Sequence, residues 1–325
     1  SQRIKMNILV LGGHGFIGHH LVRMLGDLEH TVATVDCHHQ YGDYPDYEYF
    51  AVLAQRLEYM GQHQDYRGNV RDEQFMESVF ESFRPDIVVD LATYPNAKMV
   101  ARNIIDATEN MITATALALK LSVQYKVQRF VLASSSMVYG DFQGQTPDET
   151  VACNPMTLYG SYKLQCEQMC KVFARDSGME YTILRPSALY GTRDMIVRVI
   201  SKMAVSAITK NKIIVNGPDN RLDFSYVSDV ASAFTHAAID PQCANEIYNC
   251  TRGHGRRIIE AAELIQSRIP ASIELAPHDS FYPNRDTLDS EKLQVHSDWR
   301  PKVDIEYGIP AYLDWFLAQK FINQL

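Results

Sequence analysis

The sequence predicts an α/β fold in which a doubly wound parallel sheet carries a smaller α/β lobe. Apolar runs alternate with stretches of helical period over roughly the first 185 residues. The runs are apolar throughout, as strands buried on both faces of a parallel sheet require. A glycine-rich segment also joins the first run to the first helical stretch, as in sheets that bind nucleotides.

The same two patterns, continuous apolar runs and helical apolar spacing, predict the individual strands and helices. Continuous apolar runs predict strands at residues 6–12, 30–36, 86–92, 129–135 and 181–187, and a further strand ending near Gly68. Amphipathic spacing predicts helices at residues 17–28, 106–121 and 156–176, and over the second half of a Tyr-rich insertion at residues 37–60.

The chain is longer than one hydrophobic core usually supports, so two units are expected in its 325 residues. From about residue 190 the strand–helix rhythm breaks down. We therefore predict a Rossmann-like cofactor domain at residues 1–185, to which the chain returns at about 222–252. Residues 186–325 are expected to form mainly a substrate-binding lobe.

Composition excludes several classes of function. The formal net charge is -8 and no basic run is present, which argues against nucleic acid as a partner. No apolar run is long enough to span a membrane, and the chain passes directly into a strand rather than a signal peptide, with Met6 as the expected natural start. The six cysteines are scattered; Cys166 and Cys170 lie one turn apart without a nearby histidine, so no metal site is predicted. A reduced, cytoplasmic enzyme is expected.

The glycine loop predicts a dinucleotide site. Gly12 permits the tight turn, Gly15 lets a pyrophosphate approach the backbone, and Gly18 lets the helix pack against the strand. Phe16 and Ile17 begin the helix whose first amides would face the phosphates.

The end of the second strand predicts NAD rather than NADP. Asp36 stands where a carboxylate accepts hydrogen bonds from the adenosine ribose and repels a 2′-phosphate. No Arg or Lys follows at residues 37–39. Asn69 is expected to bond the adenine amine through its side-chain oxygen. Further cofactor contacts are expected at the ends of other strands, at Val70, Leu91, Ala92, Thr93 and Pro186.

Tyr159 and Lys163 predict acid–base chemistry beside the cofactor. They are four residues apart near the start of a predicted helix and so share a face. A phenol with a pKa near ~10 is a poor base at neutral pH, but a neighbouring ammonium and the positive nicotinamide ring favour its phenolate. Tyr159 could then take a hydroxyl proton while a hydride passes to the nicotinamide. Lys163 would also hold the nicotinamide ribose.

The run Ser134–Ser136 ends the fifth predicted strand, where ligands of such sheets bind. A serine there can donate a hydrogen bond to the reacting oxygen. The alternative, a polar strand end that satisfies loop backbone, is equally open for each serine alone.

Together these motifs resemble the extended short-chain dehydrogenases, in the nucleotide-sugar epimerase/dehydratase branch. The resemblance spans nearly the whole chain. It includes the serine run before Val138-Tyr139-Gly140 and the segments LRPSALYGTR (184–193), RLDFSYVSDVASAF (221–234) and NRDTLDSEKL (284–293).

The resemblance implies roles for further residues. It places Ser135 on the catalytic Ser/Thr of the family, and Arg221 and Arg285 on a clamp for the nucleotide diphosphate. Ser136 and Met137, expected at the substrate, stand where 4,6-dehydratases carry Asp and Glu. Because neither can replace those acids, dehydration is disfavoured.

The leading hypothesis is therefore an NAD-dependent nucleotide-sugar 4-epimerase that works through a transient 4-keto sugar and keeps its NAD bound. A reductase, oxidative decarboxylase or dehydrogenase with net redox is the alternative; a dehydratase or a non-enzymatic NAD-binding protein is disfavoured. Departures at Asp90, Thr93, Ala188 and Thr192 leave the sugar and the base open. The resemblance also implies a homodimer through the helices at 106–121 and 156–176.

Overall fold

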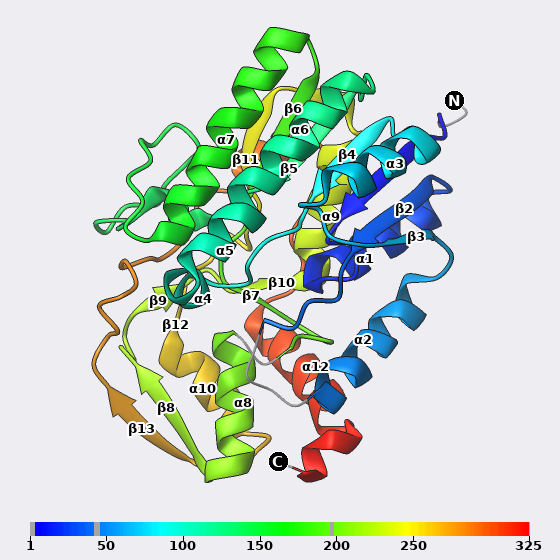
Figure 1. Cartoon of the computed structure of the whole chain (residues 1–325). Helices are drawn as coiled ribbons and strands as arrows, with labels where there is room; N and C mark the ends of the chain where they lie inside the picture. The colour runs from blue at the N-terminus through cyan, green and yellow to red at the C-terminus, as the bar shows by residue number, and fades with distance from the viewer. Residues whose placement is uncertain (1–3, 42–45, 196–197, 325) are drawn as a thin grey trace.

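A seven-stranded parallel sheet forms the centre of the upper part of the molecule (Figure 1). The computed structural model describes residues 4–41, 46–195 and 198–324. The strand order is β11-β6-β5-β4-β1-β2-β3, and every neighbouring pair runs parallel. The strands are β1 (Asn7–Leu11), β2 (Thr31–Asp36), β3 (Gln64–Arg67), β4 (Ile87–Asp90), β5 (Arg129–Ala133), β6 (Glu180–Arg185) and β11 (Glu246–Asn249).

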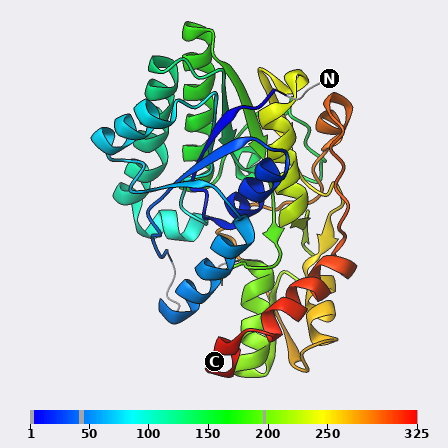
Figure 2. The ribbon, with the colours of Figure 1, turned by 90° about the vertical axis from the view of Figure 1, so that its right-hand side faces the viewer.

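Helices cover both faces of the sheet, because successive residues of a buried strand point to opposite sides. In β1, Ile8 and Val10 belong to the core under α1 (Phe16–Asp27) and α9 (Val227–Ile239). Leu9 and Leu11 belong to the core under the opposite layer, which contains α3 (Glu73–Phe83), α6 (Ala114–Gln124) and α7 (Leu158–Ser177). Figure 2 shows the two layers on either side of the sheet. The predicted doubly wound sheet is confirmed.

Residues 222–252 contribute α9 and β11 to this part of the molecule. Strand β11 pairs with β6 at the edge of the sheet, and α9 packs beside α1. The chain thus passes from the sheet to the lobe after β6 and comes back before its C-terminal segment.

The smaller lobe lies below the carboxyl ends of the strands (Figure 1). Its core unites residues from α8, α10, α12 and the parallel pair β8–β13. The elements of this half are β7 (Leu189–Tyr190), α8 (Val199–Lys210), β8 (Lys212–Asn216), β9 (Arg221–Leu222), β10 (Ser225–Tyr226), β12 (Arg256–Arg257), α10 (Ile258–Gln266), β13 (Ser272–Ala276) and α12 (Ile305–Leu317). The short helix α11 (Glu291–His296) packs against β11 at the edge of the central sheet instead.

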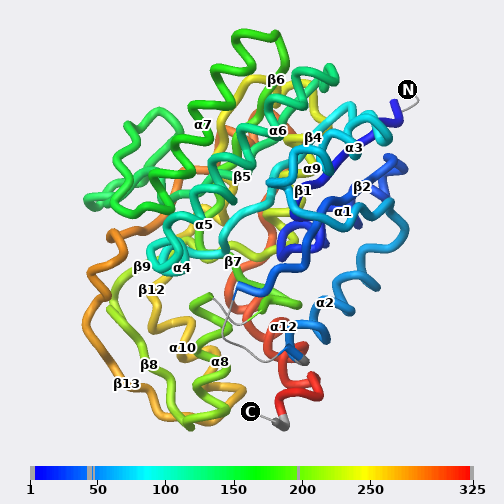
Figure 3. Tube along the Cα trace, viewed as in Figure 1, coloured from blue at the N-terminus to red at the C-terminus, as the bar shows by residue number. Residues whose placement is uncertain are grey.

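The helix predicted after β2 is α2 (Asp46–Met60), which reaches from the sheet to α12 (Figure 3). Trp315 of α12 donates its indole N–H to Gln55 of α2 at 2.8 Å, and Leu53 packs against Phe321. Residues 42–45 of the Tyr-rich insertion lie outside the described residues.

The helix predicted at 106–121 is divided. It consists of α5 (Ile104–Thr108), a π-helical turn at Glu109–Thr113 and α6, after a short α4 (Ala97–Arg102). Short 3₁₀ turns occupy Ser136–Tyr139, Pro241–Cys243 and Lys320–Gln324. In the described part of the chain no helix is both long and apolar enough to cross a bilayer.

Candidate active site

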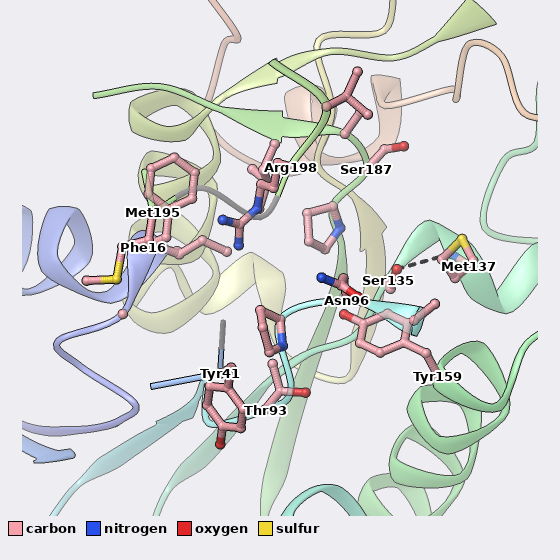
Figure 4. Close-up of a pocket in the computed structure, with 18 of the residues that line it drawn as sticks. Phe16, Tyr41, Thr93, Asn96, Ser135, Met137, Tyr159, Ser187, Met195 and Arg198 are labelled. Carbon is pink, nitrogen blue, oxygen red and sulfur yellow. Dashed lines mark hydrogen bonds between the residues drawn. The ribbon is translucent and has the colours of Figure 1, made fainter. Parts of the chain in front are cut away.

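A cavity of about 720 Å³ lies where the sheet meets the lobe, and Figure 4 shows its wall. The sheet side of the wall comes from the glycine loop and the carboxyl ends of several strands. The lobe side comes largely from α8 and the segments around Arg221 and Arg285. The residues predicted from sequence that line it are Gly12, Gly15, Phe16, Ile17, Gly18, Asp36, Val70, Leu91, Ala92, Thr93, Ser135, Met137, Tyr159, Lys163, Pro186, Arg221 and Arg285.

The glycine loop has the shape that a dinucleotide needs. Gly12 has φ +72°, and a Cβ there would lie 2.9 Å from the backbone nitrogen of Ala92. At Gly18 a Cβ would lie 2.6 Å from the Gly12 carbonyl oxygen, so only glycine lets α1 start this close to β1. The loop therefore leaves open the space that pyrophosphate occupies in folds of this kind, and the chain fits NAD at this point.

Asp36 is held in one orientation at the end of β2. Its two carboxylate oxygens accept the backbone N–H groups of His14 at 3.0 Å and His38 at 2.8 Å. A fixed carboxylate at the cavity wall suits ribose hydroxyls and repels a 2′-phosphate. Burial lowers the pKa of the neighbouring His14 to about 4, so its imidazole adds no charge at neutral pH.

Tyr159 and Lys163 lie one turn apart on α7. Thr157 caps this helix by accepting the Gly160 N–H at 3.1 Å. A Cβ on Gly160 would lie 2.5 Å from the Met137 carbonyl oxygen, so this glycine lets the helix start press against the turn that carries Ser135. The Lys163 ammonium lies 5.7 Å from the centre of the Tyr159 ring.

Lys163 is 5% exposed and has partners beneath the cavity floor. Its ammonium donates to the Ala133 carbonyl at 2.8 Å. Asp90 lies buried nearby, where it accepts the Thr115 hydroxyl at 3.0 Å and the Ala92 N–H at 3.2 Å. Burial raises the pKa of Asp90, and the charge of Lys163 opposes this rise. The sequence did not lead us to expect Asp90 beside Lys163. The signal that could have indicated it was a carboxylate at the end of an apolar strand.

Ser135 presents a hydroxyl to the cavity beside Tyr159 (Figure 4). Its Oγ accepts the Met137 N–H at 3.1 Å, in the manner of a helix cap. Because the oxygen is used as an acceptor, its own O–H remains available to donate to a ligand oxygen.

Two predicted site residues do not line the cavity. Ser136 is fully buried. Its hydroxyl donates to Ser187 at 3.1 Å and its N–H donates to the Pro186 carbonyl at 2.9 Å, and these bonds hold it away from the cavity. The side-chain oxygen of Asn69 accepts the backbone N–H of Arg71 at 3.0 Å, so it closes the turn after β3 and does not line the cavity.

A buried ion pair behind the serine run was not anticipated. Arg185 at the end of β6 donates to both carboxylate oxygens of Glu167 on α7, at 2.9 and 2.7 Å. Their side chains are 3% and 0% exposed. Glu167 also accepts the Ser134 hydroxyl, and Arg185 donates to Tyr139 at 2.8 Å. The pair joins β5, β6 and α7, and so positions Ser135 relative to Tyr159.

Cationic groups gather on the lobe side. Arg285 is half-buried, burial lowers its pKa, and its buried Nε has no hydrogen-bond partner among the described residues. Arg221 pairs with Asp286 at 3.3 Å and donates to the Gly255 carbonyl at 2.8 Å. Arg198, which lies over the Phe16 ring, and Lys202 also line the cavity. This end can hold a polyanionic group such as a diphosphate.

Cys166 and Cys170 are buried on α7, and Cys166 donates to the Met111 carbonyl. Burial raises the pKa of the Cys166 thiol to about 11, so it stays protonated at neutral pH. Neither belongs to a cluster of His, Asp, Glu and Cys ligands among the described residues.

Comparison with known proteins adds a family assignment. A family model described as "NAD dependent epimerase/dehydratase family" matches residues 8–251. A putative UDP-glucose 4-epimerase of Methanocaldococcus jannaschii is 28% identical to this chain. The match covers 95% of this chain and 97% of that protein. A dTDP-D-glucose 4,6-dehydratase of Mus musculus is also 28% identical, and the match covers 95% of this chain and 88% of that protein.

Solved structures agree with the fold. The UDP-glucose 4-epimerase of Thermotoga maritima with UDP-glucose superposes with a TM-score of 0.85 at 26% identity, over 96% of this chain and 99% of that chain. The UDP-glucose 4-epimerase of Thermus thermophilus with NAD gives a TM-score of 0.83 at 26% identity, with the same coverage. Epimerases and dehydratases both occur among the similar proteins, so the site residues must decide between the reactions.

Proposed function

The chain belongs to the NAD-dependent epimerase/dehydratase family, and within it we propose that it inverts C4 of a nucleotide sugar through a transient 4-keto sugar. One observation carries the choice of epimerisation. Among the described residues that line the cavity, the only carboxyl side chains are Asp36 and Asp279. Asp36 is held at the ribose end, and Asp279 is paired with Lys98.

Elimination of water needs an acid for the leaving hydroxyl and a base for the neighbouring carbon. The two positions after Ser135 offer a buried serine and a methionine instead. Ser135, Tyr159 and Lys163 suffice for oxidation and reduction at one carbinol. Epimerisation uses only these three groups, and this supports it over dehydration.

Tyr159 takes the proton of the 4-hydroxyl and later returns it to the same oxygen, when C4 is reduced from its opposite face. The Lys163 ammonium, 5.7 Å from the centre of the Tyr159 ring, would hold the nicotinamide ribose. Ser135 donates to the sugar oxygen and stabilises the charge that develops there. NAD, held by the loop at residues 12–18 and by Asp36, would supply the hydride acceptor and donor for C4.

Arg221 and Arg285 are proposed to hold the diphosphate of the substrate. Support comes from the open Nε of Arg285, which is buried and so needs an anionic partner to offset its desolvation. The relatives named after UDP- and dTDP-sugars are consistent with a nucleotide diphosphate in this place.

A homodimer is also proposed. Apolar side chains are exposed on α5 and α7, at Ile104, Ile105, Leu158 and Val172. Exposed apolar side chains of this kind favour burial against a second copy. Sedimentation velocity should give twice the chain mass; a monomer at micromolar concentration would contradict the proposal.

The proposed reaction is tested with a panel of UDP-, GDP-, CDP- and dTDP-sugars, incubated with purified protein and no added NAD. Inversion at C4, seen by NMR without net NADH, is expected for one of them. Net NADH formation would indicate an oxidoreductase, and loss of water would indicate a dehydratase; either result overturns the epimerase assignment.

A further inference from the structure

His14 occupies the variable position of the glycine loop and lies among other potential ligands for a metal ion. Its ring is 2% exposed and lies beside β2 and β3. Two groups of side chains around it have ligand atoms within 4.8 Å of one another in the described part of the chain. One contains Asp36 and His38, and the other contains His63 and Asp65.

The group with Asp36 and His38 has no room for an ion. The Nδ1 of His14 and the Nε2 of His38 are 2.5 Å apart, which is a shared-proton distance. Two nitrogens on one tetrahedral metal lie roughly 3.3 Å apart, given bonds of about 2.0–2.1 Å. Both oxygens of Asp36 are also occupied by backbone N–H groups.

The group with His63 and Asp65 has the spacing that a metal needs. The Nε2 of His14 lies 3.5 Å from Oδ1 of Asp65, close to the separation of two ligands on one ion. The Nδ1 of His63 is bonded to the Gly61 carbonyl at 2.9 Å, which leaves Nε2 as its ligand atom. His38 engages Nδ1 of His14, while Nε2 of His14 lies 3.0 Å from the Thr34 hydroxyl in a hydrogen bond that an ion at Nε2 would replace.

The surroundings complete the site. Thr34 donates to Asp65 at 3.2 Å and holds the carboxylate toward His14. The side chain of Asp65 is 39% exposed, so a hydrated ion can reach the ligands from solvent. The rings of His14 and His63 stand edge to face, with centroids 5.5 Å apart.

We propose that His14, His63 and Asp65 bind one divalent transition-metal ion, with water completing the coordination. Two imidazoles and one carboxylate suit zinc and its neighbours in the series; magnesium and calcium prefer oxygen ligands. The ion joins the glycine loop to β3 and to the turn before it. Its role is to stabilise the cofactor loop, since the proposed acid–base groups lie on α7 and at the end of β5.

The test uses the full chain, dialysed against a chelator and titrated with Co²⁺, whose tetrahedral complexes absorb in the visible range. We expect one Co²⁺ per chain by equilibrium dialysis, displaceable by Zn²⁺, and a rise in Tm on binding. His63→Gln and Asp65→Asn should each weaken binding by roughly tenfold or more and reduce the rise in Tm. His254→Gln, which removes an exposed histidine of the lobe, should bind as the original chain does.

Three results would overturn the site: no stoichiometric binding, unchanged affinity in both His63→Gln and Asp65→Asn, or loss of binding only in His38→Gln. Circular dichroism and retained NAD would show that each variant is folded. The readouts do not depend on turnover, so failure of the metal site is distinguishable from failure of the proposed epimerase reaction.

Discussion

The Lys163 ammonium lies 5.7 Å from the centre of the Tyr159 ring and is held from below by the Ala133 carbonyl. Lysine is therefore fixed to the end of β5, while the phenol one turn earlier faces the cavity. This arrangement keeps a positive charge next to the group proposed to carry the proton.

Replacing the phenol tests that role. Tyr159→Phe should lower kcat by roughly 10²–10⁴-fold, the range for loss of a general acid–base group. Bound NAD, measured by absorbance after denaturation, should be unchanged. Tyr162→Phe is the matched control, because the Tyr162 hydroxyl bonds to Thr108 and does not line the cavity. Equal activity in both variants would remove Tyr159 from the mechanism.

Removing the cationic clamp tests the diphosphate site. Arg221→Gln should raise KM for the substrate by about 10–100-fold, the value of a lost hydrogen bond to a charged group. The effect on kcat should be smaller. Arg257→Gln is the control, since Arg257 is a half-exposed arginine that pairs with Asp219 and lies off the cavity wall. A KM that is unchanged in Arg221→Gln would place the diphosphate elsewhere.

Breaking the buried ion pair tests its structural role. Arg185→Met should cost about 3–5 kcal/mol in the free energy of unfolding, because it leaves Glu167 charged and without its partner in the core. The double variant Arg185→Met with Glu167→Met should be more stable than Arg185→Met alone. Urea denaturation measures both. Additive losses would show that the two side chains act independently.

Acid stability depends on a buried histidine. Burial lowers the pKa of His20 to about 3, and neither ring nitrogen has a hydrogen-bond partner among the described residues. Below pH 6.5 the unfolded chain binds a proton that native His20 does not. The free energy of unfolding therefore falls as pH falls from about 6.5 toward 3, by roughly 2 kcal/mol between pH 7 and 5 for one such group.

His20→Leu removes that proton uptake. Its free energy of unfolding should fall less than that of the original chain between pH 7 and 5, by about 2 kcal/mol. Urea denaturation at both pH values measures the difference. An identical fall in the two proteins would mean that native His20 is protonated at pH 5.

The parts of the fold that sequence could predict are local. The apolar strands, the glycine loop and the four-residue step from Tyr159 to Lys163 each lie within a short stretch of chain. The carboxyl ends of parallel strands meet at one edge, so the cavity could also be predicted. The pairing of β8 with β13 could not, because the two strands are far apart along the chain and neither carries a periodic signal for the other.

Several site residues depend on similarly distant contacts. Asp90 gains its place beside Lys163 only when β4 and α7 are assembled, and the Glu167–Arg185 pair joins a helix to a strand. Ser136 was expected at the substrate, but a serine can turn either way at a strand end, and here the partner Ser187 decides its direction. The grouping of His14, His63 and Asp65 is likewise visible only after folding.

The central claim, return of the hydride to the same sugar, is tested most directly with a nucleotide sugar that carries deuterium at C4, using the substrate that the panel identifies. The protein is incubated with it without added NAD, and the product is examined by NMR and mass spectrometry. We expect an inverted C4 that keeps its deuterium, with no NADH released. Loss of deuterium from C4, to solvent or to free NADH, would contradict it.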